Sequence, residues 1–171
     1  DAYNKRITEE NKTAKKKKRL KTFKARELVT AAQYKEQFGK DYRNMVSEVH
    51  GCLGEIGARF PGYKNQGYEI MGFVWFQGWN DMFDGDALKE YEGNLINLVK
   101  DVRKEFRQPN LPVVIGELGN GGPKAGNNML AIREAQKAAA KALGPNTTFV
   151  QTTQFARPAK ESPNVGHGHH W

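Results

Sequence analysis

Apolar residues are spaced along this chain in two different patterns. In three stretches they return every three or four residues, which is typical of helices that bury one face. Between these stretches lie short runs dense in Ile, Val, Phe and Trp, typical of strands buried on both faces of a parallel sheet. The pattern predicts helices over residues 41–60, 86–106 and 127–143, and strands over residues 69–76, 111–116 and 147–152.

The order of these elements predicts the fold class. Helices and strands alternate, as in right-handed βα units on a parallel sheet, so we expect an α/β fold. Three strands make a thin sheet and the first helix has no strand before it, so we expect a fold that is incomplete at both ends. Asp41 is expected to cap the first helix and Pro61 to end it. Cys52, on the apolar side of that helix, is expected to be a buried, inert thiol.

Charge separates the first 40 residues from the rest. They hold 13 Lys or Arg and 5 Asp or Glu, which accounts for the whole formal net charge of +8. We expect residues 1–40 to form a basic insertion or arm. Its run Lys12–Arg26 could bind a polyanion, but it holds one aromatic residue, Phe23, so nucleic acid is not an expected partner. No segment approaches 18 consecutive apolar residues and no signal peptide is visible, so no membrane partner is expected.

Polar side chains follow each predicted strand at the point where its apolar run ends. The carboxyl ends of parallel strands lie at one edge of the sheet, where open α/β sheets bind ligands. Amide groups beside a glycine suit an oxyanion hole, and imidazole suits a general base, which together indicate acyl transfer. No serine or cysteine sits on a predicted strand-to-helix turn, so the nucleophile is missing. The polar groups are Gln77, Gly78, Asn80 and Asp81, then Glu117, then His167, His169 and His170.

Two blocks carry a resemblance to a known family. Gly78-Trp-Asn-Asp81 matches the Gly-x-Asn-Asp block of SGNH (GDSL-type) hydrolases, and Phe73–Asn80 resembles the Trp-x-Gln-Gly block of their sialate O-acetylesterase and acetyl xylan esterase branch. Val113–Gly119 and the final Gly-x-His170 resemble later blocks of that branch. The resemblance implies a three-layer α/β/α fold with a parallel sheet (SGNH, flavodoxin-like), of which residues 41–171 are the C-terminal part.

The resemblance also implies an activity. It implies a serine hydrolase that removes O-acetyl groups from carbohydrates through an acyl-enzyme, needs no cofactor, and is secreted or periplasmic. Gly78 and Asn80 would help to hold the oxyanion and His170 would be the base. The serine block is absent, so the nucleophile is expected in an N-terminal portion of the domain outside this chain. The residues expected to bind or orient the substrate are Gln77, Trp79, Asp81, Glu117 and His167.

Some positions depart from the family pattern or leave alternatives open. His167 stands where the family usually carries an aspartate and Trp79 where the branch carries a glutamate, so the triad carboxylate is unassigned. The histidine cluster lacks the cysteines or clustered carboxylates of a metal site, and no metal is expected. Glu117 could instead be the nucleophile of a glycoside hydrolase, although no second carboxylate pairs with it in the sequence. A third possibility is a non-enzymatic module that binds polyanions through residues 1–40.

Overall fold

The computed structural model describes residues 32, 36 and 38–161, and the contacts within the chain divide it into two units, up to Asn65 and from Gln66 onward. Most of the predicted basic arm, including the run Lys12–Arg26, therefore lies outside the described residues. The histidine-bearing segment, residues 162–171, lies outside them as well. Within the described part, no helix is long and apolar enough to cross a membrane.

The first unit contains two helices, α3 (Lys40–Gly54) and α4 (Ile56–Arg59), in place of the single helix predicted over residues 41–60. The predicted cap was wrong: the N-cap is Gly39, in the left-handed region at φ 67°, and Asp41 lies in the first turn. No residue of either helix is buried, and the prediction of a buried thiol was also wrong, because Cys52 is exposed. An amphipathic helix buries its apolar stripe only against a partner, and the described residues of this unit provide none.

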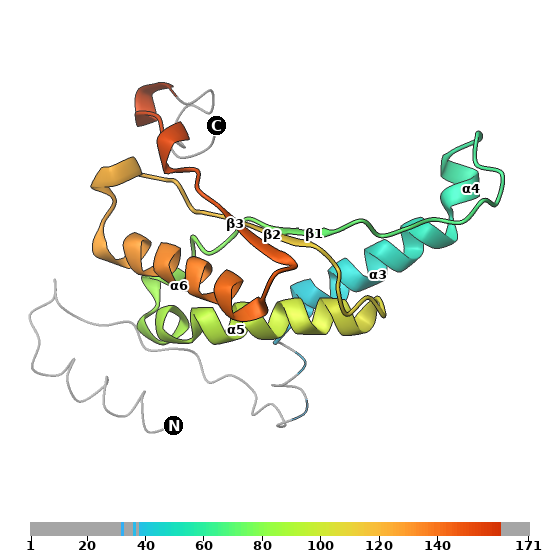
Figure 1. Ribbon diagram of the computed structural model, residues 1–171, viewed down its shortest axis with the longest axis horizontal. Helices are drawn as coiled ribbons and strands as arrows, with labels where there is room; N and C mark the ends of the chain where they lie inside the picture. The colour runs from blue at the N-terminus through green and yellow to red at the C-terminus, as the bar shows by residue number, and fades with distance from the viewer. Residues whose placement is uncertain (1–31, 33–35, 37, 162–171) are drawn as a thin grey trace, which may run out of the picture. The chain divides into compact units, whose positions relative to one another are not determined.

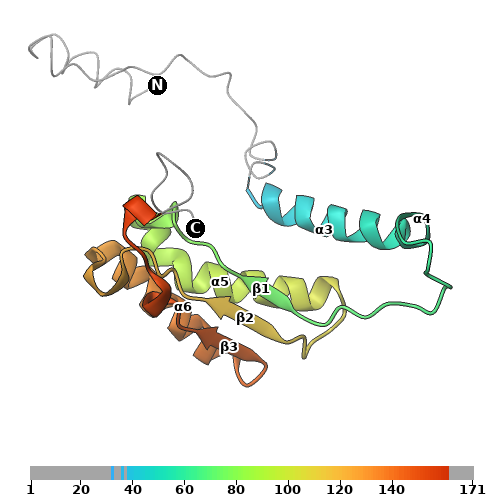
Figure 2. The ribbon, with the colours of Figure 1, turned by 90° about the horizontal axis from the view of Figure 1, so that it is seen from above.

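The second unit is built on a parallel sheet of strand order β1-β2-β3, which confirms the predicted α/β class. Helices α5 and α6 lie side by side on one face of this sheet (Figures 1 and 2). The arrangement is consistent with a three-layer α/β/α fold, of which this unit supplies the sheet and one layer of helices. The elements are β1 (Phe73–Trp75), α5 (Gly85–Glu105), β2 (Val113–Gly116), α6 (Asn127–Leu143) and β3 (Thr147–Val150), with short 3-10 helices η2 (Asp81–Phe83), η3 (Gly122–Lys124), η4 (Thr153–Phe155) and η5 (Ala159–Glu161).

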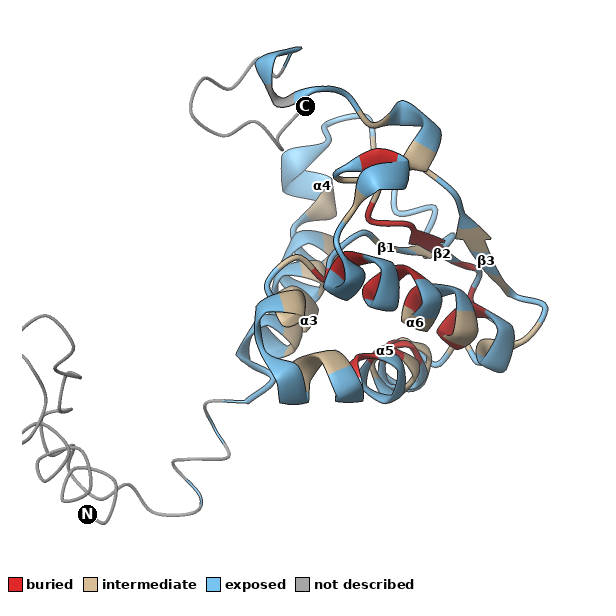
Figure 3. Cartoon of the chain, turned by 90° about the vertical axis from the view of Figure 1, so that its left-hand side faces the viewer, coloured by how far each residue is buried: buried red, intermediate tan, exposed pale blue. Residues whose placement is uncertain are grey.

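Strand register explains which residues form the core. Trp75, Ile115 and Phe149 lie side by side across the three strands, and Val113 lies one step along the same face. This face packs against the apolar stripes of both helices, and Figure 3 shows the buried residues of α5 and α6 turned toward β2. The buried helix residues of this core are Tyr91, Leu95, Val99, Met129, Ile132, Ala139 and Ala140.

The opposite face of the sheet is exposed in this unit. Val74 is 69% exposed, and Val114 and Val150 are also exposed. The sequence predicted strands buried on both faces, and within the described residues of this unit that prediction was wrong for the face that α5 and α6 do not cover. Apolar composition alone does not reveal which layer buries a strand.

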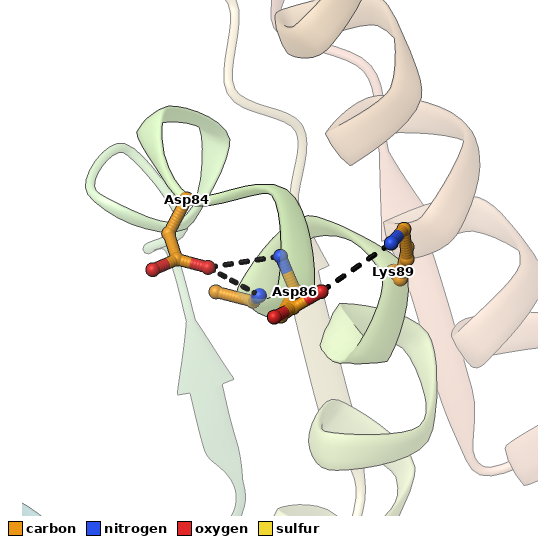
Figure 4. A network of polar contacts seen from close by, with 4 residues as sticks. Asp84, Asp86 and Lys89 are labelled. Atoms are coloured by element: carbon orange, nitrogen blue, oxygen red, sulfur yellow. Dashed lines mark hydrogen bonds and ion pairs between the residues drawn. The ribbon is translucent and has the colours of Figure 1, made fainter. Parts of the chain in front are cut away.

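The first residues of α5 fix the end of the loop that follows β1. Asp84 is the N-cap, and its carboxylate accepts hydrogen bonds from the N–H groups of Asp86 (2.9 Å) and Ala87 (3.0 Å) (Figure 4). The Ala87 N–H, followed by that of Asp86, holds the pKa of Asp84 below its usual range. Lys89 pairs with Asp86 at 3.3 Å in the same turn. The loop from Gln77 to Phe83 is therefore anchored by β1 at one end and a capped helix at the other.

Candidate active site

A cavity of about 430 Å³ lies where the loops after β1 and β2 meet, beyond the carboxyl ends of the strands. Trp79 and Met82 line it from the first loop, and the stretch 120–129 lines most of the rest. This is the position at which open α/β sheets bind ligands.

The turn after β1 is organised around the side chain of Gln77. Its Oε1 accepts hydrogen bonds from two successive backbone N–H groups, those of Gly78 (2.9 Å) and Trp79 (3.3 Å). Asn80 follows and is exposed, and its carbonyl accepts the N–H of Phe83 at 3.2 Å as η2 begins. Within the described residues, the side-chain amide of Asn80 has no hydrogen-bond partner. It is therefore available to a ligand.

Two residues of the helices hold this turn from the core side. The Tyr91 hydroxyl donates a hydrogen bond to the carbonyl of Gln77 and accepts one from Trp75 Nε1 at 3.0 Å. The side-chain Nε2 of Gln136 lies 3.2 Å from the same carbonyl. Gly78 is buried directly against Tyr91, and a Cβ at Gly78 would lie 2.8 Å from the tyrosine oxygen. The backbone at Gln77 and Gly78 is thus fixed by side chains from both α5 and α6.

Trp79 and Asp81 lie between the turn and the cavity. Trp79 is half-buried, packs edge-on against Phe83 with ring centres 5.7 Å apart, and forms one wall of the cavity. Asp81 is half-buried near Tyr91. Burial raises the pKa of Tyr91, and the negative charge of Asp81 adds to the rise, while hydrogen bonds from Trp75 and Gln136 oppose it. Tyr91 therefore keeps its proton at neutral pH.

Glu117 lies at the end of β2 and is only 6% exposed. Its Oε2 accepts hydrogen bonds from the N–H groups of Thr152 and Thr153, both at 2.9 Å, and from the Thr153 hydroxyl. The Thr152 hydroxyl in turn donates to the Glu117 carbonyl at 2.6 Å. These contacts favour a loop-stabilising role over the substrate-binding and nucleophilic roles that the sequence suggested: the carboxylate attaches the segment after β3 to the end of β2.

We expect Glu117→Ala to speed amide hydrogen exchange at Thr152 and Thr153 by about tenfold or more, since three hydrogen bonds are lost. Burial raises the pKa of Glu117, but the hydrogen bonds from Thr153 and Thr152 and the charge of Arg133 outweigh it and lower the pKa. A carboxyl with a lowered folded pKa stabilises the protein above its unfolded pKa of about 4.3 and loses that contribution as pH falls through the folded value. The protection of these amides, measured relative to the intrinsic exchange rate at each pH, should therefore be lost as the pH falls through the lowered folded pKa of Glu117.

Glu134, exposed on α6, provides the matched control. Glu134→Ala should leave the exchange rates of Thr152 and Thr153 unchanged. Equal rates in Glu117→Ala and the unmutated protein at neutral pH would contradict the attachment described above.

The glycine-rich loop after Glu117 is held by one buried guanidinium. Arg133, 6% exposed on α6, donates to the carbonyls of Leu118 (2.7 Å), Asn120 (2.9 Å) and Gly122 (2.9 Å). These bonds give the wall of the cavity that carries Asn120 and Gly121 its conformation.

The structure thus brings together one part of the predicted site. Gln77 to Asp81 share a single loop beside the cavity, whereas Glu117 lies beneath the neighbouring loop. His167, His170 and Ser162 fall outside the described residues, and the serine within them is Ser47, on α3. Among residues 32, 36 and 38–161, no group of three or more His, Cys, Asp or Glu is placed to hold a metal ion.

The roles of Gln136, Arg133 and Tyr91 were not identified from the sequence. A signal was present: Arg133 and Gln136 interrupt the apolar stripe of α6, between Ile132 and Ala139. A polar residue at a core position of a helix needs buried partners, and here those partners are the strand ends that form the site.

Comparisons with known proteins found relatives of this chain. The family model of carbohydrate esterases described as sialic acid-specific acetylesterase matches residues 28–162. A protein of Arabidopsis thaliana described as a probable carbohydrate esterase is 31% identical over 70 residues, which are 41% of this chain and 25% of that protein. The X-ray structure of that Arabidopsis protein aligns with 82% of this chain and 49% of its own length, at 25% identity and a TM-score of 0.49. The present chain thus spans about half the length of this relative or less.

Proposed function

Because this chain belongs to the sialic acid-specific acetylesterase family of carbohydrate esterases, we propose that it takes part in the hydrolysis of O-acetyl esters on carbohydrates. The observation that carries the proposal is the turn after β1. The turn carries a fixed backbone N–H, at Gly78, and the amide of Asn80, which no described residue engages, on either side of Trp79, which lines the cavity. A flat aromatic ring beside amide groups suits the apolar and polar faces of a sugar.

The proposed mechanism is acyl transfer through a serine. The serine hydroxyl attacks the acetyl carbonyl while His170 takes its proton, and the carbonyl oxygen becomes an oxyanion held by Gly78 and Asn80. The sugar leaves with the proton from His170, and water then releases acetate by the same steps. We propose that the serine lies in an N-terminal portion of the domain outside this chain, as the resemblance to SGNH hydrolases implies.

The contacts of Glu117 weigh against the glycoside hydrolase alternative. A nucleophilic carboxylate must reach the sugar, and this one is buried with its Oε2 engaged by Thr152 and Thr153. The alternative of a polyanion-binding module rests on residues that the structure does not describe, and no observation favours it.

Acetate release tests the proposal directly. We expect the full-length protein to release acetate from 4-nitrophenyl acetate and from acetylated xylan, His170→Ala to abolish this activity, and Asn80→Ala to lower kcat by about 10²- to 10³-fold, as for loss of an oxyanion donor. Asn94→Ala, on the exposed face of α5, is the matched control and should keep full activity. Full activity in both His170→Ala and Asn80→Ala would show that the assigned residues are wrong.

A further inference from the structure

Two neighbouring N–H groups in this protein converge on one oxygen atom. The N–H groups of Gly78 and Trp79 point at Gln77 Oε1, at 2.9 Å and 3.3 Å. Successive backbone N–H groups aimed at one point form the kind of concavity that binds anions and oxyanions. The oxygen now at that point belongs to an exposed side chain, which can leave by rotating about its own bonds.

The direction of the first N–H group follows from what holds the preceding carbonyl. The Gln77 carbonyl is turned toward the core, where it accepts from the Tyr91 hydroxyl and lies 3.2 Å from Gln136 Nε2. Across a trans peptide bond the carbonyl and the following N–H point in opposite directions. Holding the Gln77 carbonyl inward therefore turns the Gly78 N–H outward.

Both side chains that hold the carbonyl are themselves fixed. Gln136 is fully buried, accepts the Leu118 N–H at 3.1 Å and lies 3.2 Å from the Gly116 carbonyl, so it connects the ends of β1 and β2. Tyr91 is 4% exposed and accepts a hydrogen bond from Trp75. The raised pKa of Tyr91 keeps its hydroxyl protonated and able to donate. These features give the turn the rigidity that a preorganised hydrogen-bond site needs.

We propose that Tyr91 and Gln136 are positioning residues that aim the N–H groups of Gly78 and Trp79 at one oxyanion-binding point, which the amide oxygen of Gln77 occupies until a substrate oxygen displaces it. The inference rests on the proposed function for the identity of that oxygen, the oxyanion formed from an acetyl ester. It adds the Trp79 N–H to the donors expected from the sequence, and it gives Gln77 the role of a placeholder.

A placeholder of this kind favours the transition state over the ground state. A neutral ester carbonyl is a weaker hydrogen-bond acceptor than the neutral Gln77 amide, so the exchange is not favourable in the ground state. An oxyanion makes shorter and stronger bonds than either. The exchange therefore becomes favourable as negative charge develops, which is the condition for catalysis rather than tight substrate binding.

Acetate binding tests the site without requiring turnover. In the ¹⁵N-labelled full-length protein, we expect acetate to shift the amide resonances of Gly78 and Trp79 in a saturable way. Gln77→Ala removes the competing oxygen, and we expect it to lower the acetate Kd by about three- to tenfold. Gln77 is exposed, so this variant should fold normally. The inference is overturned if neither amide responds to acetate in either protein, or if Gln77→Ala leaves the Kd unchanged.

Kinetics test the positioning role of Tyr91. Tyr91→Phe keeps the ring and removes the hydroxyl, so we expect kcat to fall by about tenfold with KM within about twofold, and the acetate-induced shift of Gly78 to shrink. Tyr68→Phe, on an exposed tyrosine of the same unit, should change neither. Gln77→Ala removes the oxygen that competes with the substrate for this point, so we expect kcat/KM to rise by about three- to tenfold. A tenfold fall in that variant would show that Gln77 is a donor and not a placeholder.

The two proposals fail in different ways. If the amides respond to acetate as expected and the full-length protein cleaves no acetyl ester, the proposed function is wrong and the anion site stands. If the protein has esterase activity, Tyr91→Phe keeps full kcat and acetate does not shift the amide resonances of Gly78 and Trp79, the proposed function stands and the positioning role is wrong.

Discussion

Replacing Gly78 with alanine is expected to lower kcat/KM for acetate release by about 10²- to 10³-fold, the loss associated with removing an oxyanion donor. The new Cβ would lie 2.8 Å from the Tyr91 oxygen, a distance that real Cβ atoms essentially never show, and 3.0 Å from its ring. The backbone at Gly78 also has φ 140°, which strains any residue with a Cβ. Tyr91 must move, and its hydrogen bond to the Gln77 carbonyl is lost with it.

A second glycine gives the matched control. Gly93 lies on α5 with no atom within 4 Å of an added Cβ, so Gly93→Ala should keep full activity. It should also raise the free energy of unfolding by up to about 1 kcal/mol, because alanine favours a helix over glycine. Acetate release and thermal unfolding measured on both variants separate loss of the site from loss of the fold. Normal activity in Gly78→Ala would mean that the turn after β1 does not carry the chemistry.

Replacing Arg133 with alanine is expected to lower the free energy of unfolding by roughly 3 kcal/mol or more, the largest loss of stability among these variants. Three carbonyl groups, those of Leu118, Asn120 and Gly122, lose a charged donor together. Removing one partner from a buried hydrogen-bond network leaves the others unsatisfied, which costs more than the bond itself contributes. Urea unfolding followed by tryptophan fluorescence measures the effect.

Two further variants show whether the shape of the guanidinium matters. Arg133→Lys keeps the charge, but a compact ammonium cannot span three separate carbonyls, so we expect an intermediate loss of stability. Lys137→Ala removes an exposed cation one turn further along α6 and should change the urea midpoint little. If Arg133→Ala unfolds at the same urea concentration as the unmutated protein, the guanidinium does not hold the loop.

The sequence predicted the elements well where periodicity was long and failed where burial depended on a partner. The predicted helix over residues 127–143 has the same bounds as α6, and the sheet is parallel as the alternation of elements required. The apolar stripe of residues 41–60 was expected to be buried and is at most half-buried, and the outer face of the strands was expected to be buried and is exposed. An apolar pattern indicates what a surface can bury and not what lies against it.

The residue types of the candidate site could be predicted from the sequence, but the hydrogen bonds that hold them in place could not. Gly78 and Asn80 stand out because they follow a strand directly. The contacts of Tyr91 and Gln136 with Gln77 join residues 14 and 59 positions apart, and no local pattern encodes contacts at that separation. Glu117 is of the residue type and position expected of a catalytic carboxylate. Only the three hydrogen bonds that its Oε2 accepts indicate a structural role instead.

The uncovered face of the sheet has a practical consequence for anyone who makes this chain on its own. Valines at positions 74, 114 and 150 are exposed there, and within the described residues the outer side of β1 pairs with no strand. An apolar face beside an open strand is a template for intermolecular β-pairing, and therefore for aggregation during expression and concentration. Poor yield of such a preparation would report on this surface, and it would say nothing about the chemistry of the turn at Gly78.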